Sequence, residues 1–218
     1  MDTMSLTSKI YPNVTIGEGT IIEDGCMIGI PKKGNKPGEL ETTIGRNCVI
    51  RSGTYIYAGN KIGDNFQTGN KANIREQNII GNNVSVGTLS VVEHDVIIED
   101  NVRVHTQVFI PEFTILKKGC WIGPNVVFTN AFHPLCPDAQ NCLKGATVEE
   151  GAKIGANSTI MPAVIIGKNA LIGAGSLVTK DVTANKVAAG HPAKEIKDAT
   201  DITCKYGRRE KPYEDTLS

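Results

Sequence analysis

Apolar side chains recur every six positions along most of this 218-residue chain. The series has 25 positions, of which 24 are apolar and one, Thr68, is not. Fifteen consecutive repeats, from Ile44 to Phe128, keep the phase without a break, which indicates a repeat architecture. The two interruptions divide the series into three runs: Ile10, Ile16, Ile22, Ile28; Ile44, Ile50, Ile56, Ile62, Thr68, Ile74, Ile80, Val86, Val92, Ile98, Val104, Ile110, Leu116, Ile122, Phe128; and Val148, Ile154, Ile160, Ile166, Ile172, Val178.

Two further columns keep the same period. The residue two positions before each apolar position is nearly always small, as at Cys48, Ser90 and Ala170. The residue three positions after it is Asn or Gly in fifteen of the 25 repeats, and both types tolerate positive φ. Ile and Val number 42 against 9 Leu, which favours strands over helices. Each hexad is therefore predicted to be a short strand and a sharp turn, with one large and one small side chain directed inward.

Three such hexads close one coil of a three-sided prism, in which parallel strands stack about 4.8 Å apart from coil to coil. The 25 hexads would form about eight coils. Over residues 10–180 the pattern resembles the left-handed parallel β-helix of the hexapeptide-repeat acyltransferases, and the left hand rests on that resemblance. We expect an all-β domain at residues 1–192 and a C-terminal tail at 193–218, either extended or a short helix.

The two interruptions at residues 31–41 and 130–145 are predicted to leave the same edge of the prism. Ile28 and Phe128 fall on one face if each insertion replaces a corner, which puts the loops about five coils, or about 24 Å, apart. Loops on a rigid scaffold often carry function. The loop at 31–41 is either a surface excursion or the border of a substrate pocket.

The second loop contains the most informative motif, Phe-Thr-Asn at 128–130 followed by His133-Pro134. It resembles the extended loop of sugar and nucleotide-amino-sugar acetyltransferases. The resemblance makes His133 the general base, directed toward a neighbouring subunit, and Asn130 a substrate contact. Imidazole suits this role because it titrates near neutral pH. The alternatives are a loop histidine packed beside Pro134 and an asparagine that stabilises its own corner.

Two more candidates come from stacking the repeats. His105 stands in a column of outward positions that is otherwise rich in glycine, including Gly87 and Gly123, which would leave room for a substrate. It is therefore a substrate-contacting or proton-handling candidate, or an exposed bystander. Trp121 precedes an inward Ile and faces outward, so it borders either the acceptor site or a subunit contact.

The last coils carry the strongest family motif, GANSTIMPAVIIGKNALIGAGSLVTKDV followed by VAAGHPAK. In the family this end holds the pantetheine arm of coenzyme A in a groove between subunits. By resemblance five residues contact the co-substrate: Ala156, Ala174, Thr179, Lys180 and Lys194. Small residues let an amide chain approach the backbone, and lysines suit phosphates. The alternative is repeat filler and solvated lysines.

These motifs predict an acetyl-CoA-dependent acetyltransferase that acts on the amine of a nucleotide-linked amino sugar, or on a sugar hydroxyl as galactoside and maltose enzymes do. The resemblance implies a homotrimer and no metal. A γ-type carbonic anhydrase is disfavoured because His94, His105 and His133 lack the close spacing of its zinc ligands. A non-catalytic trimeric scaffold is a further alternative, because the repeat alone would permit it. Such a scaffold would need neither the loop motif nor the C-terminal motif.

Composition narrows the partners and the compartment. Twenty-three basic residues balance twenty-three acidic ones, so no broad basic face is available for nucleic acid. No apolar run is long enough for a membrane span, and no secretory signal is apparent at Met1. The six cysteines form no CxxC pair, and we expect reduced thiols and a cytoplasmic location.

Overall fold

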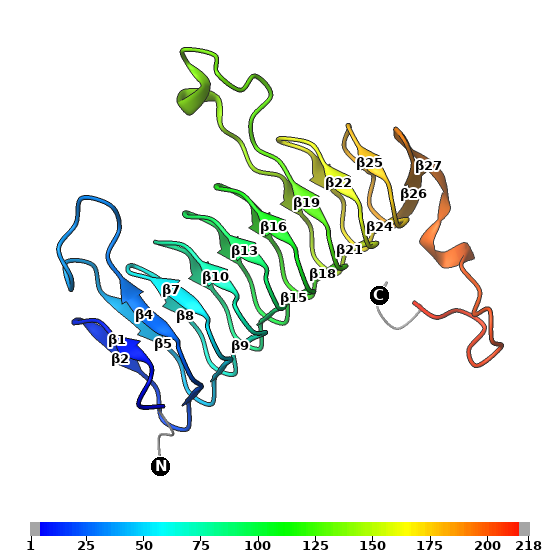
Figure 1. Ribbon diagram of the computed structural model, residues 1–218. Helices are drawn as coiled ribbons and strands as arrows, with labels where there is room; N and C mark the ends of the chain where they lie inside the picture. Colours follow the sequence, from blue (N-terminus) through cyan, green and yellow to red (C-terminus); the bar gives the residue numbers. More distant parts are fainter. Residues whose placement is uncertain (1–4, 214–218) are drawn as a thin grey trace.

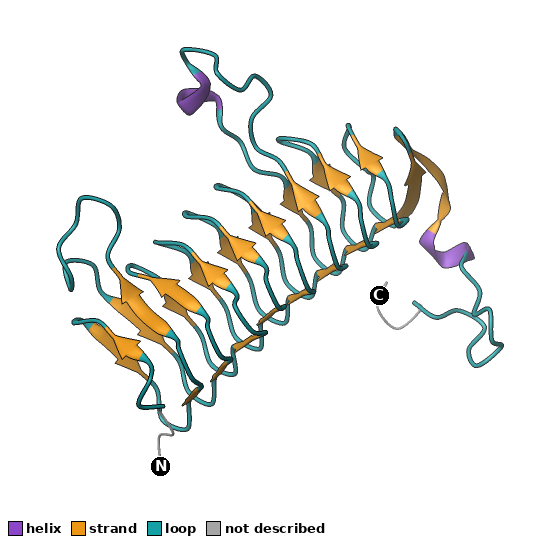
Figure 2. Ribbon diagram, in the orientation of Figure 1, coloured by secondary structure: helices purple, strands orange, loops and turns teal. Residues whose placement is uncertain are grey.

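The computed structural model describes residues 5–213, which form a three-sided prism of short strands (Figures 1 and 2). Each face is one sheet, and the chain visits the three sheets in turn. The nine-stranded sheet contains β1 (Lys9–Ile10), β4 (Met27–Ile30), β7 (Tyr55–Tyr57), β10 (Asn73–Ile74), β13 (Val91–Val92), β16 (Phe109–Ile110), β19 (Val127–Phe128), β22 (Thr159–Ile160) and β25 (Leu177–Val178).

The other two faces follow the same plan. The eight-stranded sheet contains β2 (Val14–Ile16), β5 (Thr42–Ile44), β8 (Lys61–Ile62), β11 (Ile79–Ile80), β14 (Ile97–Ile98), β17 (Ile115–Leu116), β20 (Thr147–Val148) and β23 (Ile165–Ile166). The ten-stranded sheet contains β3 (Ile21–Ile22), β6 (Val49–Ile50), β9 (Gln67–Thr68), β12 (Ser85–Val86), β15 (Arg103–Val104), β18 (Trp121–Ile122), β21 (Lys153–Ile154), β24 (Leu171–Ile172), β26 (Lys186–Gly190) and β27 (Ala193–Asp198).

The pairing register confirms the predicted coil length. Ile56 pairs with Ile74 and Ile74 with Val92, so neighbouring parallel strands are 18 residues apart. The period lengthens only across the insertions, where Ile28 pairs with Ile56 and Leu116 with Val148. Each loop thus replaces one corner and leaves the stacking intact.

The core consists of the two inward columns predicted from the sequence. Ile28, Ile74 and Ile154 have no exposed surface, and the small residues Cys48 and Ala170 are equally buried beside them. The polar exception in the large column is accommodated by hydrogen bonds. The Thr68 hydroxyl lies 3.1 Å from that of Thr54 and accepts the main-chain N–H of Arg51 at 2.9 Å.

Positive φ recurs at the predicted corners whatever the residue type. All but three of the 25 corner residues adopt it, among them Asn47, Leu89 and Phe113. Leu89 at φ 57° and Phe113 at φ 65° show that the prism imposes the left-handed conformation even where the side chain disfavours it. Asn and Gly are thus frequent at corners because they adopt it at low cost.

Both insertions leave the edge where the chain passes from the nine-stranded to the eight-stranded sheet, as predicted, since they follow β4 and β19 (Figure 1). We call it the nine-to-eight edge. Loop 31–41 is tied to its corner by a hydrogen bond from Asn13 Nδ2 to the Gly38 carbonyl at 3.0 Å. It also reaches along the edge, where Lys32 Nζ donates to Gln77 Oε1 at 3.1 Å. Loop 130–145 projects further and contains a short 3-10 helix, η1 (Ala139–Cys142).

A hairpin closes the C-terminal end of the prism. β26 adds to β24 in parallel, and β27 pairs with β26 in antiparallel fashion. The domain boundary expected at residue 192 falls inside this hairpin, and the ten-stranded sheet continues to Asp198. A second 3-10 helix, η2 (Ala199–Asp201), and residues 202–213 follow. Residues 1–4 of the expected domain and 214–218 of the expected tail lie outside the described residues.

The six cysteines divide between the core and the surface. Cys26, Cys48 and Cys120 fill small buried positions, and burial raises the pKa of the Cys120 thiol to about 12. All six thiols are free in the described residues. The helical structure seen between residues 5 and 213 is confined to short turns, none of which could cross a bilayer.

Candidate active site

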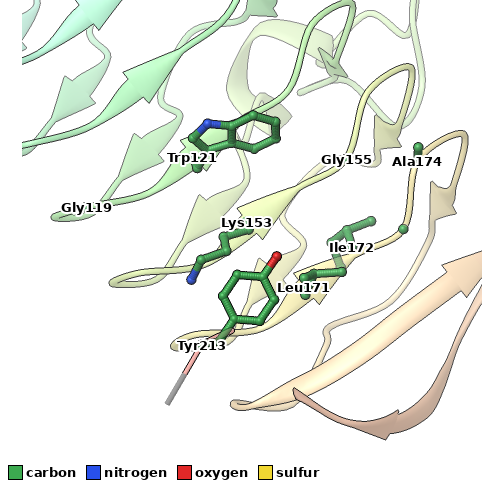
Figure 3. A pocket seen from close by; sticks show the side chains of 9 residues that line it. Gly119, Trp121, Lys153, Gly155, Leu171, Ile172, Ala174 and Tyr213 are labelled. Carbon is green, nitrogen blue, oxygen red and sulfur yellow. The ribbon is translucent and has the colours of Figure 1, made fainter. Parts of the chain in front are cut away.

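A cavity of about 540 Å³ opens on the outer face of the ten-stranded sheet (Figure 3). Its floor is formed by outward side chains of three successive strands, Trp121 of β18, Lys153 of β21 and Leu171 of β24. The C-terminal segment covers one side with the ring of Tyr213. The full lining is Gly119, Trp121, Lys153, Gly155, Leu171, Ile172, Gly173, Ala174 and Tyr213. We call this cavity the sheet pocket.

Lys153 adds a cation to this mostly apolar wall. Its Nζ donates to the Gly151 carbonyl at 2.8 Å and lies 5.0 Å from the centroid of the Tyr213 ring. Burial lowers the pKa of the Lys153 ammonium from its ordinary value. The sheet pocket therefore suits a ligand with an apolar body and a polar or anionic group.

The ring of His105 packs against that of Trp121, with the two ring centroids 4.6 Å apart. Its Nε2 is buried and has no hydrogen-bond partner among residues 5–213. Burial, and secondarily the charge of Arg103, lower the pKa of His105 from its ordinary value. His105 therefore packs against Trp121, which lines the sheet pocket, while its own Nε2 is buried.

The glycines of the His105 column have a structural cause that differs from the expected one. A Cβ at Gly87 would lie 2.3 Å from the main-chain carbon of His105, and one at Gly123 would lie 2.7 Å from the nitrogen of Ala156. Those directions are occupied by the next coil, so the glycines permit close backbone stacking rather than leaving space for a substrate.

The predicted coenzyme A contacts separate into two groups. Ala174 is exposed and lines the sheet pocket, and Ala156 follows the lining residue Gly155 one coil earlier. Thr179 and Lys180 follow β25 on the nine-stranded sheet, and Lys194 lies in β27. All three are exposed, but none of them lines the sheet pocket.

Sequence reasoning assigned only two of the nine lining residues to a site, Trp121 and Ala174, and missed among others the side chains of Lys153, Leu171 and Tyr213. Lys153 and Leu171 could have been found, because they occupy the same outward column as Trp121 on the next two coils. Tyr213 lies beyond the repeat, so no periodic signal could have placed it beside Lys153.

The predicted general base lies in a different part of the chain. His133 is exposed in loop 130–145, with its ring centroid 6.4 Å from that of Phe132. Its imidazole makes no side-chain hydrogen bond within the described residues. The loop is closed at its base by the Lys144 N–H, which donates to the Asn130 carbonyl at 2.9 Å. The side chain of Asn130 points to Glu112, with Nδ2 donating to Oε2 at 2.7 Å.

One chain does not bring His133 and the sheet pocket together. The loop leaves the nine-to-eight edge, and in a three-sided prism this edge lies opposite the ten-stranded face (Figure 1). Trp121, Ala174 and Ala156 therefore gather on one side, and Asn130 and His133 on the other. In the described part of the chain, no three His, Cys, Asp or Glu side chains gather closely enough to hold a metal ion.

Family models match the repeats. The model described as "Bacterial transferase hexapeptide (six repeats)" matches residues 79–112 and 145–180, and "Hexapeptide repeat of succinyl-transferase" matches residues 42–58. Among solved structures, UDP-N-acetylglucosamine acyltransferase from Campylobacter jejuni has a TM-score of 0.60 at 15% identity, covering 89% of this chain and 74% of that one. The enzyme from Bacteroides fragilis has the same TM-score at 17% identity, covering 90% and 74%. These likenesses show the left-handed β-helix fold.

Named relatives are acetyltransferases. A 2,3,4,5-tetrahydropyridine-2,6-dicarboxylate N-acetyltransferase of Staphylococcus aureus is 38% identical over 85 residues, 39% of this chain and 33% of the relative. A galactoside O-acetyltransferase of Lactococcus lactis is 35% identical over 178 residues, which cover 78% of this chain and 71% of the relative. Because that identity extends over most of both chains, this protein belongs to the hexapeptide-repeat acyltransferase family and is a coenzyme A-dependent acyltransferase.

Proposed function

We propose that this protein transfers an acetyl group from acetyl-CoA to the amine of a nucleotide-linked amino sugar, with His133 as the general base. The main support for this proposal is that loop 130–145, which contains His133, lies on the opposite side of the chain from the sheet pocket. An exposed imidazole on one edge and a ligand-sized cavity on the opposite face are the two halves of a transfer site. They require a second copy of the chain to meet.

A homotrimer supplies that copy. In a closed ring of three chains, the loop of each subunit faces the next subunit by the same rotation, so three equivalent sites form. Each site would take Asn130 and His133 from one chain, and Trp121, Ala156 and Ala174 from its neighbour. Thr179, Lys180 and Lys194 would then lie toward the nucleotide end of coenzyme A, beyond the sheet pocket.

The chemistry is a direct attack on the thioester. The acceptor nitrogen forms a bond to the acetyl carbonyl carbon, the carbon–sulfur bond breaks, and coenzyme A leaves with the sulfur. His133 removes the proton that the nitrogen loses, and main-chain N–H groups stabilise the developing oxyanion. The proton finally passes to the departing thiolate, so acetylated sugar and free coenzyme A are the products.

A sugar hydroxyl is the second candidate acceptor. The relation to a galactoside O-acetyltransferase over 78% of the chain supports it. A hydroxyl needs the base more than an amine does, because it must lose its proton as it attacks. The proposal places the protein in the cytoplasm, where acetyl-CoA is present and thiols remain reduced.

Thiol release from acetyl-CoA tests the proposal against a panel of galactosides, simple hexoses and nucleotide-linked amino sugars. Release with an amino sugar alone supports N-acetylation, and release with a galactoside alone transfers the assignment to the hydroxyl. Release with none of them, while coenzyme A still raises the melting temperature, would contradict both sugar acceptors and leave the donor site standing.

A further inference from the structure

Four polar side chains stack along the nine-to-eight edge, one on each successive coil. Glu76, His94, Glu112 and Asn130 each stand two positions after the inward residue of a nine-stranded-sheet strand and are 18 residues apart. The last of them forms the base of the loop that carries His133. The edge thus connects a row of charged groups to the predicted acceptor side of the site.

Asn130 is held at both its main chain and its side chain. The main-chain oxygen accepts the Lys144 N–H at 2.9 Å, and Nδ2 donates to Glu112 Oε2 at 2.7 Å. An asparagine that served its own corner would bond neighbouring main-chain groups instead. The only side-chain hydrogen bond of Asn130 within residues 5–213 runs to Glu112 on the preceding coil.

This bond fixes which end of the carboxamide faces outward. An ionised carboxylate only accepts hydrogen bonds, so Glu112 binds the NH₂ end of Asn130 and turns Oδ1 away. The bond is charge-assisted and therefore stronger than one between neutral groups. The remaining carboxamide oxygen can only accept a hydrogen bond, so it would select a ligand that donates one.

Glu112 also contacts a side chain of the preceding coil. His94 Nε2 lies 3.5 Å from Glu112 Oε1, and His94 Nδ1 lies 2.8 Å from Asp95 Oδ2. The nearby guanidinium of Arg75 is engaged elsewhere, at 2.9 Å from Glu76 and 3.3 Å from Glu93. One oxygen of Glu112 therefore faces His94 while the other receives Asn130.

We propose that Glu112, which also contacts His94, is a positioning residue that presents Asn130 Oδ1 to the nucleophilic amine of the acceptor. The inference rests on the proposed function and deepens it. Oδ1 would accept one N–H of the amine while His133 takes the other proton, which the nitrogen loses as it bonds to the acetyl carbon. An acceptor group without such a hydrogen would not be aligned.

Kinetics of Glu112→Met test the proposal, because methionine has a similar length and cannot accept this bond. We expect kcat for the acceptor to fall about tenfold or more, the scale of a lost hydrogen bond to a charged group, with KM for acetyl-CoA within about twofold of wild type. The kcat of Glu112→Gln should lie between those of wild type and Glu112→Met, since a glutamine can bond either end of the Asn130 carboxamide. Glu99→Met is the matched control: Glu99 also accepts a hydrogen bond, from the Lys118 N–H at 2.9 Å, but on another edge.

A double mutant separates positioning from a structural role. In the Asn130→Ala background, Glu112→Met should reduce kcat by less than about twofold, because the group it orients is gone. Equal losses in both backgrounds, or wild-type kcat in Glu112→Met alone, would overturn the proposal.

If no acceptor on the panel is turned over, that result counts against the proposed function. NMR of the protein labelled selectively with ¹⁵N-asparagine then still tests the inference. The Asn130 side-chain amide, identified by its disappearance in Asn130→Ala, should move and lose protection from hydrogen exchange in Glu112→Met but not in Glu99→Met. If the Asn130 resonance is unchanged in Glu112→Met, this result alone would refute the claim that Glu112 orients the Asn130 carboxamide.

Discussion

Mixed trimers offer a direct test of a site shared between chains. Two variants are needed, each defective in one half. His133→Ala removes the predicted base, and we expect turnover to fall by about 100-fold or more. Ala174→Arg fills the sheet pocket from an exposed position, so the variant should fold and lose acetyl-CoA binding.

The expected recovery follows from the geometry. If the two variants are mixed in equal amounts, unfolded and refolded together, each site draws its loop and its pocket from different chains. In a random ring of three, the loop at a given site is intact with a chance of one half, and so is the pocket. Both are intact at about a quarter of the sites, so about a quarter of wild-type activity should return. If loop and pocket of one chain formed the site, every site would keep a defect and activity would stay at the level of the parents.

The assay is thiol release with the best acceptor of the panel. Mixing without unfolding is the control, because it leaves the parental trimers intact. Activity that stays within a few-fold of the parents after refolding, with trimers confirmed by light scattering, would refute the shared site. It would also require loop 130–145 to reach a pocket of its own chain.

Three further predictions concern the prism itself. Ile98→Ala should lower the free energy of unfolding by about 2–5 kcal/mol in chemical denaturation, while Ile97→Ala on the same strand should cost less than about 1 kcal/mol, because Ile98 is 1% exposed and Ile97 38%. Similar losses for both would contradict the inward assignment. Leu89→Asn should raise stability by about 1 kcal/mol, since asparagine tolerates the corner φ of 57° better than leucine; a loss measured in the same assay would show that Leu89 makes compensating contacts. Burial lowers the pKa of Lys153 in the folded protein. Between this pKa and the ordinary lysine value, the unfolded chain therefore binds more protons than the folded one, and stability rises with pH. Lys153→Met should therefore exceed wild type in melting temperature most clearly near neutral pH, with the difference shrinking toward pH 10; a constant difference would remove the titration as its cause.

The fold was predictable because its cause is periodic. Ile74 and Ile154 are both buried because both occupy the inward position of the six-residue repeat. Assigning the inward position in one hexad therefore predicts it in the others. Corners follow the same logic, so Leu89 and Phe113 adopt positive φ although their side chains oppose it. The edge shared by the two loops could also be predicted, since counting hexads places β4 and β19 on one sheet.

The site was predictable only where it repeats. The outward position of Trp121 was read from the repeat, and the same outward column contains Lys153 and Leu171, whereas Ala174 was identified from the family motif of the last coils. Tyr213 and Glu112 could not be found this way. Tyr213 reaches the pocket through a segment without period, and the bond between Glu112 and Asn130 depends on side-chain conformations that spacing does not specify.

The two halves of the proposed site therefore differ in how far their chemistry can be derived. The sheet pocket is made from fixed positions of rigid coils, so a co-substrate shared by a whole family can be recognised by the same columns in every member. The acceptor side depends on a loop that the repeat leaves unconstrained, and residues such as Phe132 and Cys136 can vary there without cost to the core. The hydrogen bond from Asn130 to Glu112 ties one residue of this loop to a coil position of fixed register. Acceptor chemistry, a hydrogen-bond donor at the nucleophile, is then set by the prism, while acceptor shape is set by the loop.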